Sequence, residues 1–254
     1  MPAPTNPFKK ALHEGKQQIG CWAGFADPYA TEVLATANFD WLVIDGEHAP
    51  NDIRSLMAQL AILDGKHSHP VVRLPVGNDW LIKQALDIGA QTLLIPMVET
   101  AEQARDLVRA SLYPPHGIRG SGAALARASR FSDIPDYVQT ANDQIMVIPQ
   151  VETVKGMQNL EEILKVDGID AVFIGPSDLA ADMGYLGDTT QQQVQDTIKA
   201  AIMVIAAAGK SPGILAVEDA AARRYAEWGA KFIAVGIDVV MLAKTARATM
   251  QGWT

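Results

Sequence analysis

The chain has 254 residues, of which 48% are apolar and 20% charged, and this composition excludes disordered and fibrous classes. Its formal net charge of −8 argues against a nucleic-acid partner, since phosphates would be repelled. No apolar run reaches the roughly 18 to 20 residues that span a bilayer, and the start M-P-A-P-T-N-P-F-K-K lacks a signal-peptide core. Because Cys21 is the only cysteine, we expect no disulfide, a packed Cys21 and a cytoplasmic location.

Strand-like runs alternate along the chain with helical patterns and short connections, as in βα units. The helical pattern between Asp79 and Gly89 is an example, with Leu81, Ala85 and Leu86 on one face and Gly89 as the C-cap. We count eight strands, at 19–24, 41–45, 71–74, 92–97, 145–151, 171–175, 213–217 and 232–236. With no Pro/Gly/Ser-rich linker, eight units predict a single α/β domain over residues 1–254, a (β/α)8 TIM barrel.

The segment 113–142 breaks this rhythm, because it is long, irregular and carries Arg119, Arg127 and Arg130. It follows a helix and precedes a strand, which favours the amino end of the barrel. Thirty residues are also long enough to span the barrel, so its position stays open. Its motif G-I-R-G-S-G suits either a site-lining or a subunit-contact role.

Two related motifs, L-L-I-P-M-V-E-T and M-V-I-P-Q-V-E-T, differ in Met97 against Gln150. A thioether is a poor ligand for a hard cation and an amide oxygen is a good one. Strand alternation makes Gln150 and Glu152 project together. Only the second motif therefore predicts a site for Mg²⁺ or Mn²⁺, and Glu99 in the first reads as a helix-start residue.

A second carboxylate, Asp178 in G-P-S-D-L, lies about one βα unit after Glu152. Adjacent strands of a barrel bring their carboxyl ends together, so the two side chains should reach one ion. The alternative makes Glu152 a helix-dipole carboxylate and Asp178 an N-cap. We favour the metal site because both carboxylates follow consecutive strands with Gln150 alongside.

The strand W-L-V-I-D-G-E-H ends in Asp45, Glu47 and His48. Histidine suits general base catalysis near neutrality, and a carboxylate partner would fix its tautomer. Asp45 and Glu47 have the opposite strand parity to His48. The sequence therefore predicts that the partner of this base lies elsewhere.

The motif V-V-R-L-P places Arg73 at the end of an apolar strand, on the face of Val71 and hence inside the barrel. A buried guanidinium needs an anionic partner, and its fork fits a carboxylate or an enolate oxygen. The alternative is an internal salt bridge to Glu47 or Asp45. Base, cation and arginine on successive strand ends suggest carbanion chemistry beside a carbonyl.

These residues belong to a series of motifs, spread over nearly the whole chain, that are similar to those of a known protein family. The motifs are D-G-E-H-A-P-N, V-V-R-L-P, L-L-I-P-M-V, Y-P-P-H-G-I-R-G, Q-V-E-T, G-P-S-D-L and P-G-I-L. In their order and spacing the chain resembles the HpcH/HpaI aldolase family. The resemblance implies a phosphoenolpyruvate/pyruvate-type barrel and a class II aldolase, which cleaves or forms 4-hydroxy-2-oxo acids from a pyruvate or hydroxypyruvate enolate and an aldehyde.

The resemblance also implies a divalent cofactor, Mg²⁺, Mn²⁺ or Co²⁺, and roles for particular residues. The matching positions are Glu152 and Asp178 for the metal, His48 and Asp87 for the base and its partner, Arg73 for the enolate, and Gln150, Ser177 and the backbone near Asp178 for substrate contact. It favours homo-oligomers, hexamers built from dimers that exchange the C-terminal helix. That helix has an apolar face and ends near Trp253, and from the residues it suits either its own barrel or a neighbour's.

Three alternatives remain open. A Schiff-base aldolase needs a lysine at a strand's carboxyl end, but Lys155 falls in a helix's first turn, and Lys210 and Lys231 precede their strands. A citrate lyase-type enzyme acting on CoA esters needs a phosphate site, which an acidic chain does not favour. A non-catalytic oxo-acid-binding barrel would not need the base and the arginine. The sequence does not decide the donor, the aldehyde, the native metal or the pathway.

Overall fold

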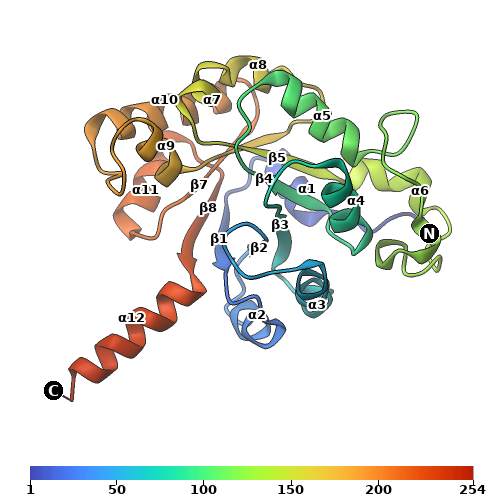
Figure 1. Cartoon of the computed structure of the whole chain (residues 1–254), viewed down its shortest axis with the longest axis horizontal. Helices are drawn as coiled ribbons and strands as arrows, with labels where there is room; N and C mark the ends of the chain where they lie inside the picture. Colours follow the sequence, from blue (N-terminus) through green and yellow to red (C-terminus); the bar gives the residue numbers. More distant parts are fainter. Residues whose placement is uncertain (254) are drawn as a thin grey trace.

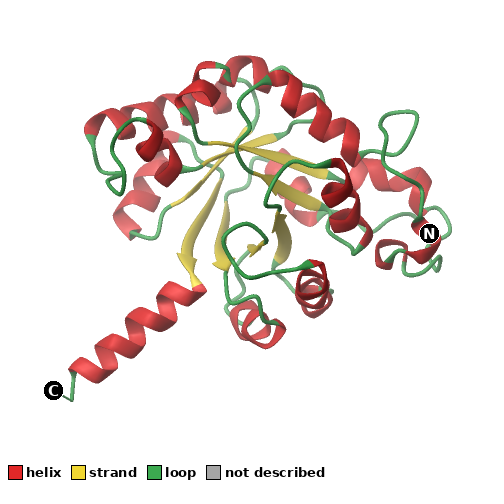
Figure 2. Ribbon diagram, in the orientation of Figure 1, coloured by secondary structure: helices red, strands yellow, loops and turns green. Residues whose placement is uncertain are grey.

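The structure is a computed structural model that describes residues 1–253, and its centre is a closed barrel of eight parallel strands (Figures 1 and 2). The strands are β1 Gln18–Ala23, β2 Trp41–Asp45, β3 His69–Arg73, β4 Thr92–Ile95, β5 Met146–Val151, β6 Ala171–Ile174, β7 Ser211–Leu215 and β8 Phe232–Ile237. Each strand pairs with the next, and β1 pairs with β8. The predicted (β/α)8 barrel is confirmed, with every strand end within two residues of its expected place.

Helices follow the strands around the outside of the barrel. They are α1 Pro7–His13, α2 Pro28–Ala35, α3 Ile53–Leu63, α4 Asp79–Asp87, α5 Ala101–Ser111, α6 Tyr137–Thr140, α7 Val154–Gln158, α8 Leu160–Leu164, α9 Pro176–Asp182, α10 Gln192–Ala207, α11 Asp219–Trp228 and α12 Asp238–Gln251. Short polar side chains begin several of them by accepting backbone N–H groups, as Asn78 does for α4 and Thr100 for α5. Such caps fix where each helix leaves the carboxyl end of its strand.

The strands separate two apolar layers. In β2, Trp41 and Val43 point into the barrel while Leu42 and Ile44 pack against helices. Phe8 of α1 fills the amino end of the barrel, with its ring centre 5.7 Å from that of Trp41. The interior is therefore filled with apolar side chains toward the amino ends of the strands. Polar side chains gather at the carboxyl ends of the strands. Cys21 is fully buried in the outer layer, as expected.

Helix α4 shows how far the face prediction held. Ala85 and Leu86 are buried as expected, but the third buried residue is Ile82, and Leu81 is only partly covered. The buried face of α4 is therefore shifted by about one residue from the predicted face. Gly89 adopts φ +111°, which supports its predicted role at the helix end, because other residues rarely take that conformation.

The segment 113–142 lies at the amino end of the barrel, the position that connectivity favoured. It contains α6 and the short 3₁₀ turns Ala123–Leu125 and Arg127–Ser129, and the turn Ala141–Gln144 follows. Its Thr140 hydroxyl accepts a 2.8 Å hydrogen bond from the N–H of Ala3. Tyr113, Ile134 and Tyr137 form with Ala3 a small separate core.

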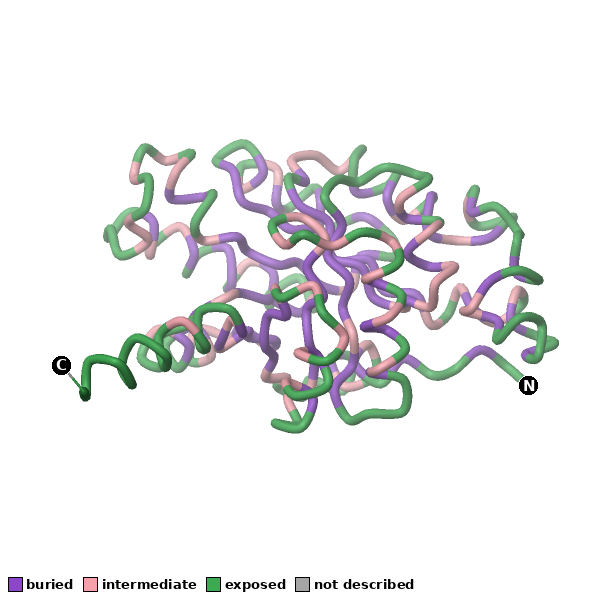
Figure 3. Tube along the Cα trace, turned by 60° about the horizontal axis from the view of Figure 1, so that its bottom comes forward, coloured by how far each residue is buried: buried purple, intermediate pink, exposed green. Residues whose placement is uncertain are grey.

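Helix α12 projects away from the barrel (Figures 1 and 3). Apolar side chains along it are exposed, including Leu242 at 59% and Met250 at 61%, and Trp253 just beyond it at 86%. The helix therefore does not cap its own barrel. Among residues 1–253, no helix is both long and apolar enough for a membrane span.

Candidate active site

Gln150 and Glu152 project together at the carboxyl end of β5, as strand alternation predicted. The Nε2 atom of Gln150 donates to Oε2 of Glu152 at 2.5 Å, and the backbone N–H of Met97 donates to Oε1 at 2.8 Å. Strand β6 pairs directly with β5, so Gly175 after β6 lies against this carboxylate. A Cβ on Gly175 would come within 2.2 Å of Glu152 Oε2, so only glycine fits there.

Glu152 is an electrostatically unusual carboxyl group. Burial raises its pKa to about 7; hydrogen bonds from Gln150 and Met97 oppose this rise, and the charges of Asp178 and Glu47 add to it. The Oε1 atom of Gln150 is buried without a hydrogen-bond partner. Buried acceptor oxygens that repel one another are the environment that a hard cation stabilises.

Asp178 is the third residue of α9, where it is exposed beside Ser177. Gly175 is the N-cap and makes no side-chain cap, so the alternative that Asp178 is an N-cap is wrong. Its charge contributes to the raised pKa of both Glu152 and Glu47, after burial, which is the main cause for each.

These donors fit a divalent cation of the magnesium type. Within residues 1–253 no group of three or more His, Cys, Asp or Glu side chains is arranged to hold a metal ion. Mg²⁺, however, is commonly bound by one or two carboxylates and completes its shell with water and substrate. Glu152 and Asp178 match that count, and the unpaired Gln150 oxygen supplies a further acceptor.

Arg73 at the end of β3 is buried and held by neighbouring acids. Its Nε and Nη2 donate to Asp45 at 2.8 and 2.6 Å, and Nη1 lies 2.8 Å from Oε2 of Glu47, without the alignment of a hydrogen bond. The guanidinium also lies over the Trp22 ring, 4.9 Å from its centre. The alternative weighed from sequence, an internal salt bridge, is therefore what this chain forms.

The two acids differ in their response to Arg73. Burial alone would raise the pKa of Asp45, but the hydrogen bonds and charge of Arg73 outweigh it and lower that pKa. For Glu47 burial prevails, and its pKa is raised despite Arg73 and His48. Asp45 thus works as the fixed anion that orients the arginine.

His48 follows the turn at Gly46, beyond the end of β2, so strand parity no longer governs its direction. Its side chain is 68% exposed, and Nε2 lies 3.8 Å from Oε2 of Glu47, too far for a hydrogen bond. The ring is therefore accessible to a substrate at the carboxyl end of the barrel. Because no residue in the described part of the chain, 1–253, hydrogen-bonds to the ring, that part does not fix its tautomer.

The expected pairing of His48 with Asp87 is not formed within one chain. Helix α4 starts after the carboxyl end of β3 and returns to the amino end, where Asp87 is its last residue. There Nη2 of Arg119 donates to Asp87 at 2.8 Å. The barrel thus separates Asp87 from His48, which follows β2 at the other end.

The lysines lie where the sequence predicted. Lys155, in the first turn of α7, is 61% exposed and donates to Glu99 at 2.8 Å. Glu99 precedes the cap of α5 and also accepts from Thr153, which agrees with its predicted helix-start role. Lys210 and Lys231 precede β7 and β8, at the amino end.

Sequence reasoning missed the supporting roles of Trp22 and Gly175, and it left Asp45 as one of two possible partners of Arg73. Trp22 Nε1 donates to Asp45 at 3.2 Å while its ring covers Arg73, so one side chain holds both members of the pair. A signal for Asp45 was available, since it ends β2 on the same inward face as Trp41 and Val43. Gly175 had no such signal, because close approach depends on the strand register.

The pattern described as "HpcH/HpaI aldolase/citrate lyase" matches residues 18–245. A hydroxypyruvate/pyruvate aldolase of Roseovarius nubinhibens is 70% identical over 253 residues, covering 100% of this chain and 98% of the relative. A 4-hydroxy-2-oxo-heptane-1,7-dioate aldolase of Salmonella dublin is 56% identical, covering 96% and 93%. The crystal structure of a family protein from Burkholderia cenocepacia has a TM-score of 0.94 at 41% identity, covering 98% and 99% of the two chains.

Proposed function

The chain belongs to the HpcH/HpaI aldolase/citrate lyase family and is a carbon–carbon lyase, an aldolase. From this premise we propose that it uses a divalent cation, Mg²⁺, Mn²⁺ or Co²⁺, to split or form 4-hydroxy-2-oxo acids, with pyruvate or hydroxypyruvate as donor and an aldehyde as acceptor. The observation that carries the proposal is the buried Glu152 carboxyl group beside the unpaired Oε1 of Gln150. Burial raises the pKa of Glu152, and the charge of Asp178 adds to that rise. This cluster lies at the carboxyl ends of the strands, where barrels of this type perform catalysis.

Glu152 and Asp178 are the proposed metal ligands, with Gln150 and Ser177 beside them to contact substrate. When bound, the cation acts as a Lewis acid that polarises the keto group of the oxo acid. Gly175 leaves room for the Glu152 carboxylate, and Met97 N–H orients one of its oxygens. The other oxygen is oriented by Gln150.

Arg73 is the proposed stabiliser of negative charge on the substrate. Asp45 accepts from Nε and Nη2, so Nη1, which pairs with Glu47 at 2.8 Å but makes no hydrogen bond to it, is the donor proposed to face an enolate oxygen. A donor fixed in advance stabilises developing charge without reorganising during the reaction. Trp22 keeps water from one face of the guanidinium.

His48 is the proposed base. In cleavage it takes the proton of the 4-hydroxyl as the C3–C4 bond breaks, so the aldehyde leaves and the bond's electron pair passes into the enolate. Protonation of C3 then gives the free oxo acid. In synthesis, His48 takes the proton from the carbon next to the keto group, and the enolate attacks the aldehyde.

We further propose a cytoplasmic homo-oligomer, with the hexamer as the form that the resemblance favours. Asp87 faces away from His48 of its own chain, so its proposed role as partner of the base requires a second copy. The exposed apolar side chains of α12 support contact between copies, because side chains such as Leu242 are costly to leave in water. The buried, unpaired Cys21 accords with a reducing compartment.

The test is pyruvate release from 4-hydroxy-2-oxoheptanedioate, followed with a coupled dehydrogenase, before and after EDTA and after addition of Mg²⁺ or Mn²⁺. We expect EDTA to abolish cleavage and the metal to restore it. Cleavage that EDTA does not affect would overturn the metal proposal and revive the Schiff-base mechanism, despite the pairing of Lys155 with Glu99. Borohydride trapping of a pyruvate adduct would then identify the lysine.

A further inference from the structure

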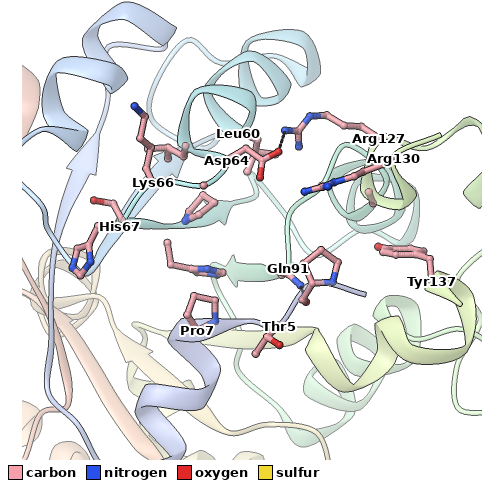
Figure 4. Close-up of a pocket in the computed structure, with 18 of the residues that line it drawn as sticks. Thr5, Pro7, Leu60, Asp64, Lys66, His67, Gln91, Arg127, Arg130 and Tyr137 are labelled. Atoms are coloured by element: carbon pink, nitrogen blue, oxygen red, sulfur yellow. Dashed lines mark hydrogen bonds and ion pairs between the residues drawn. The ribbon is translucent and has the colours of Figure 1, made fainter. Parts of the chain in front are cut away.

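A cavity of about 500 Å³ opens at the amino end of the barrel, opposite the candidate active site (Figure 4). Residues from the chain start, the end of α3, the start of β3 and the segment 113–142 surround it. Leu60, Leu63 and Pro70 contribute apolar lining, and Arg127, Arg130 and Tyr137 line it from the segment 113–142. None of these residues takes part in the proposed aldol chemistry.

One of its arginines has a structural explanation. Arg127 donates to Oδ2 of Asp64 at 3.2 Å and to the carbonyl oxygen of Ile88 at 3.3 Å. Both acceptors stand at the ends of helices α3 and α4, whose carboxyl ends favour cations. Arg127 therefore joins two helix ends, and its charge is already balanced.

Arg130 has no such explanation. It is exposed, and within residues 1–253 its guanidinium makes neither a hydrogen bond nor an ion pair. Figure 4 shows it pointing into the cavity from the same side as the Tyr137 hydroxyl. An arginine paired with nothing and aimed at a cavity offers its five N–H donors to a ligand.

The backbone that presents Arg130 is in an unfavourable conformation. Arg130, Phe131 and Ser132 have φ of +52°, +56° and +73°, the left-handed region that non-glycine residues avoid. Ser129 Oγ holds the turn by accepting from Ser132 N–H at 3.0 Å, and Ala126 O accepts from Phe131 N–H at 3.1 Å. Such maintained strain is typical of ligand clamps.

The charges around the cavity are also unbalanced. Three basic residues line the cavity, Lys66, Arg127 and Arg130, against a single carboxylate, Asp64, although the whole chain carries −8. Lys66 extends away from the centre in Figure 4, so its charge acts at the rim. A local excess of positive charge on an acidic protein attracts small anions.

We propose that this cavity binds a small oxyanion, a carboxylate or a phosphate ester, through the Arg130 guanidinium with the Tyr137 hydroxyl as a second donor. A guanidinium fork binds either class in a bidentate manner. Leu60 and Leu63 accept a short apolar body beside the anionic group. The volume suits a small molecule.

Isothermal titration of the full-length protein with inorganic phosphate, with succinate and with neutral glycerol, at constant ionic strength, tests the proposal. We expect saturable binding of at least one anion, none of glycerol, and about tenfold weaker binding in Arg130→Asn, since one charge-assisted contact is lost. Asparagine tolerates the left-handed backbone, so this variant should fold. Arg105→Gln, which removes an exposed, unpaired arginine of α5, is the matched control and should bind as the wild type does.

Binding of phosphate alone assigns the site to phosphate esters, and binding of succinate alone assigns it to carboxylates. Loss in Arg130→Asn with retention in Arg105→Gln separates this cavity from any anion bound at the active site. The proposal is overturned if neither anion saturates the protein, or if Arg130→Asn and Arg105→Gln bind equally well. Tyr137→Phe should weaken binding by a smaller factor than Arg130→Asn, and equal binding by this variant and the wild type would remove the hydroxyl from the site.

Discussion

Asp45 holds Arg73 through two parallel hydrogen bonds, from Nε to Oδ1 at 2.8 Å and from Nη2 to Oδ2 at 2.6 Å. A lysine at position 73 has no planar fork for Asp45 and cannot present a second, fixed donor to substrate. We expect Arg73→Lys to lower kcat/KM for 4-hydroxy-2-oxoheptanedioate by about 10²- to 10³-fold, the usual effect of removing a donor to developing charge. Coupled pyruvate release measures it.

Asp45→Asn provides a graded companion to that variant, because it keeps the arginine but weakens its anchor. We expect an intermediate loss in kcat/KM, and Arg105→Lys on α5 should behave as the wild type. An Arg73→Lys enzyme as active as the wild type would show that the salt bridge is only structural.

The metal proposal predicts that Glu152 dominates ion binding. Glu152→Gln should weaken Mn²⁺ binding by at least about 100-fold and Asp178→Asn by about tenfold or more, because each removes a charged oxygen ligand. Since burial raises the Glu152 pKa to about 7, protons compete with Mn²⁺ below that pH, and affinity should fall between pH 7 and 6. Calorimetric titration measures both effects. Asp106→Asn on α5, 65% exposed, is the control, and Mn²⁺ affinity unaffected by Glu152→Gln would place the ion elsewhere.

His48 provides the third prediction. His48→Ala should reduce kcat by about 10²- to 10⁴-fold, the range expected when a general base is removed. Mn²⁺ affinity should stay unchanged, because the imidazole is not a proposed ligand. His13→Ala, at the amino end and 52% exposed, controls for loss of a surface histidine. Full cleavage activity in His48→Ala would exclude the base assignment.

The barrel was predictable because each strand is a continuous apolar run between helical patterns, and the paired Gln150 and Glu152 followed from alternation alone. The partner of Arg73 was not, because alternation gives a residue's face but not its register. Only the pairing of β2 with β3, which sets Asp45 beside Arg73, chooses Asp45 over Glu47 for the bidentate contact.

The separation of Asp87 from His48 within one chain could not be predicted, for a different reason. The resemblance supplied a pair of residues without saying which chain carries each one, and a helix that returns to the amino end cannot bring Asp87 to His48 in one chain. The Arg119 contact to Asp87 depends on the irregular segment 113–142, whose path no periodic pattern could predict.

Helix α12 predicts self-association. Leu242→Lys should shift the mass measured by light scattering during gel filtration toward the monomer value of 27.3 kDa, because a buried contact between copies would then carry an unpaired charge. Lys244→Gln changes an exposed residue of the same helix and should leave the assembly intact. A wild-type protein that elutes as a monomer would contradict the proposed oligomer.

His69 predicts how stability depends on pH. The ring is buried, its Nε2 lies 2.9 Å from Thr92 Oγ1, and burial lowers its pKa to about 3. In the unfolded chain this histidine titrates near pH 6.5. Below that pH the unfolded state therefore binds a proton that the folded state does not bind. Stability is therefore kept above about pH 6.5 and lost as pH falls toward 3, at up to about 1.4 kcal/mol per pH unit.

Urea unfolding at pH 7.5 and at pH 5.0 measures this loss, which should be about 2 kcal/mol for the wild type from His69 alone. His69→Gln should start less stable, since it loses its stacking on Phe8, but its loss between the two pH values should be smaller by that amount. Thr92→Val removes the hydrogen-bond partner and keeps the buried ring. Because burial is the cause of the shift, Thr92→Val should retain the wild-type pH dependence, and an equal loss in wild type and His69→Gln would show that other groups carry it.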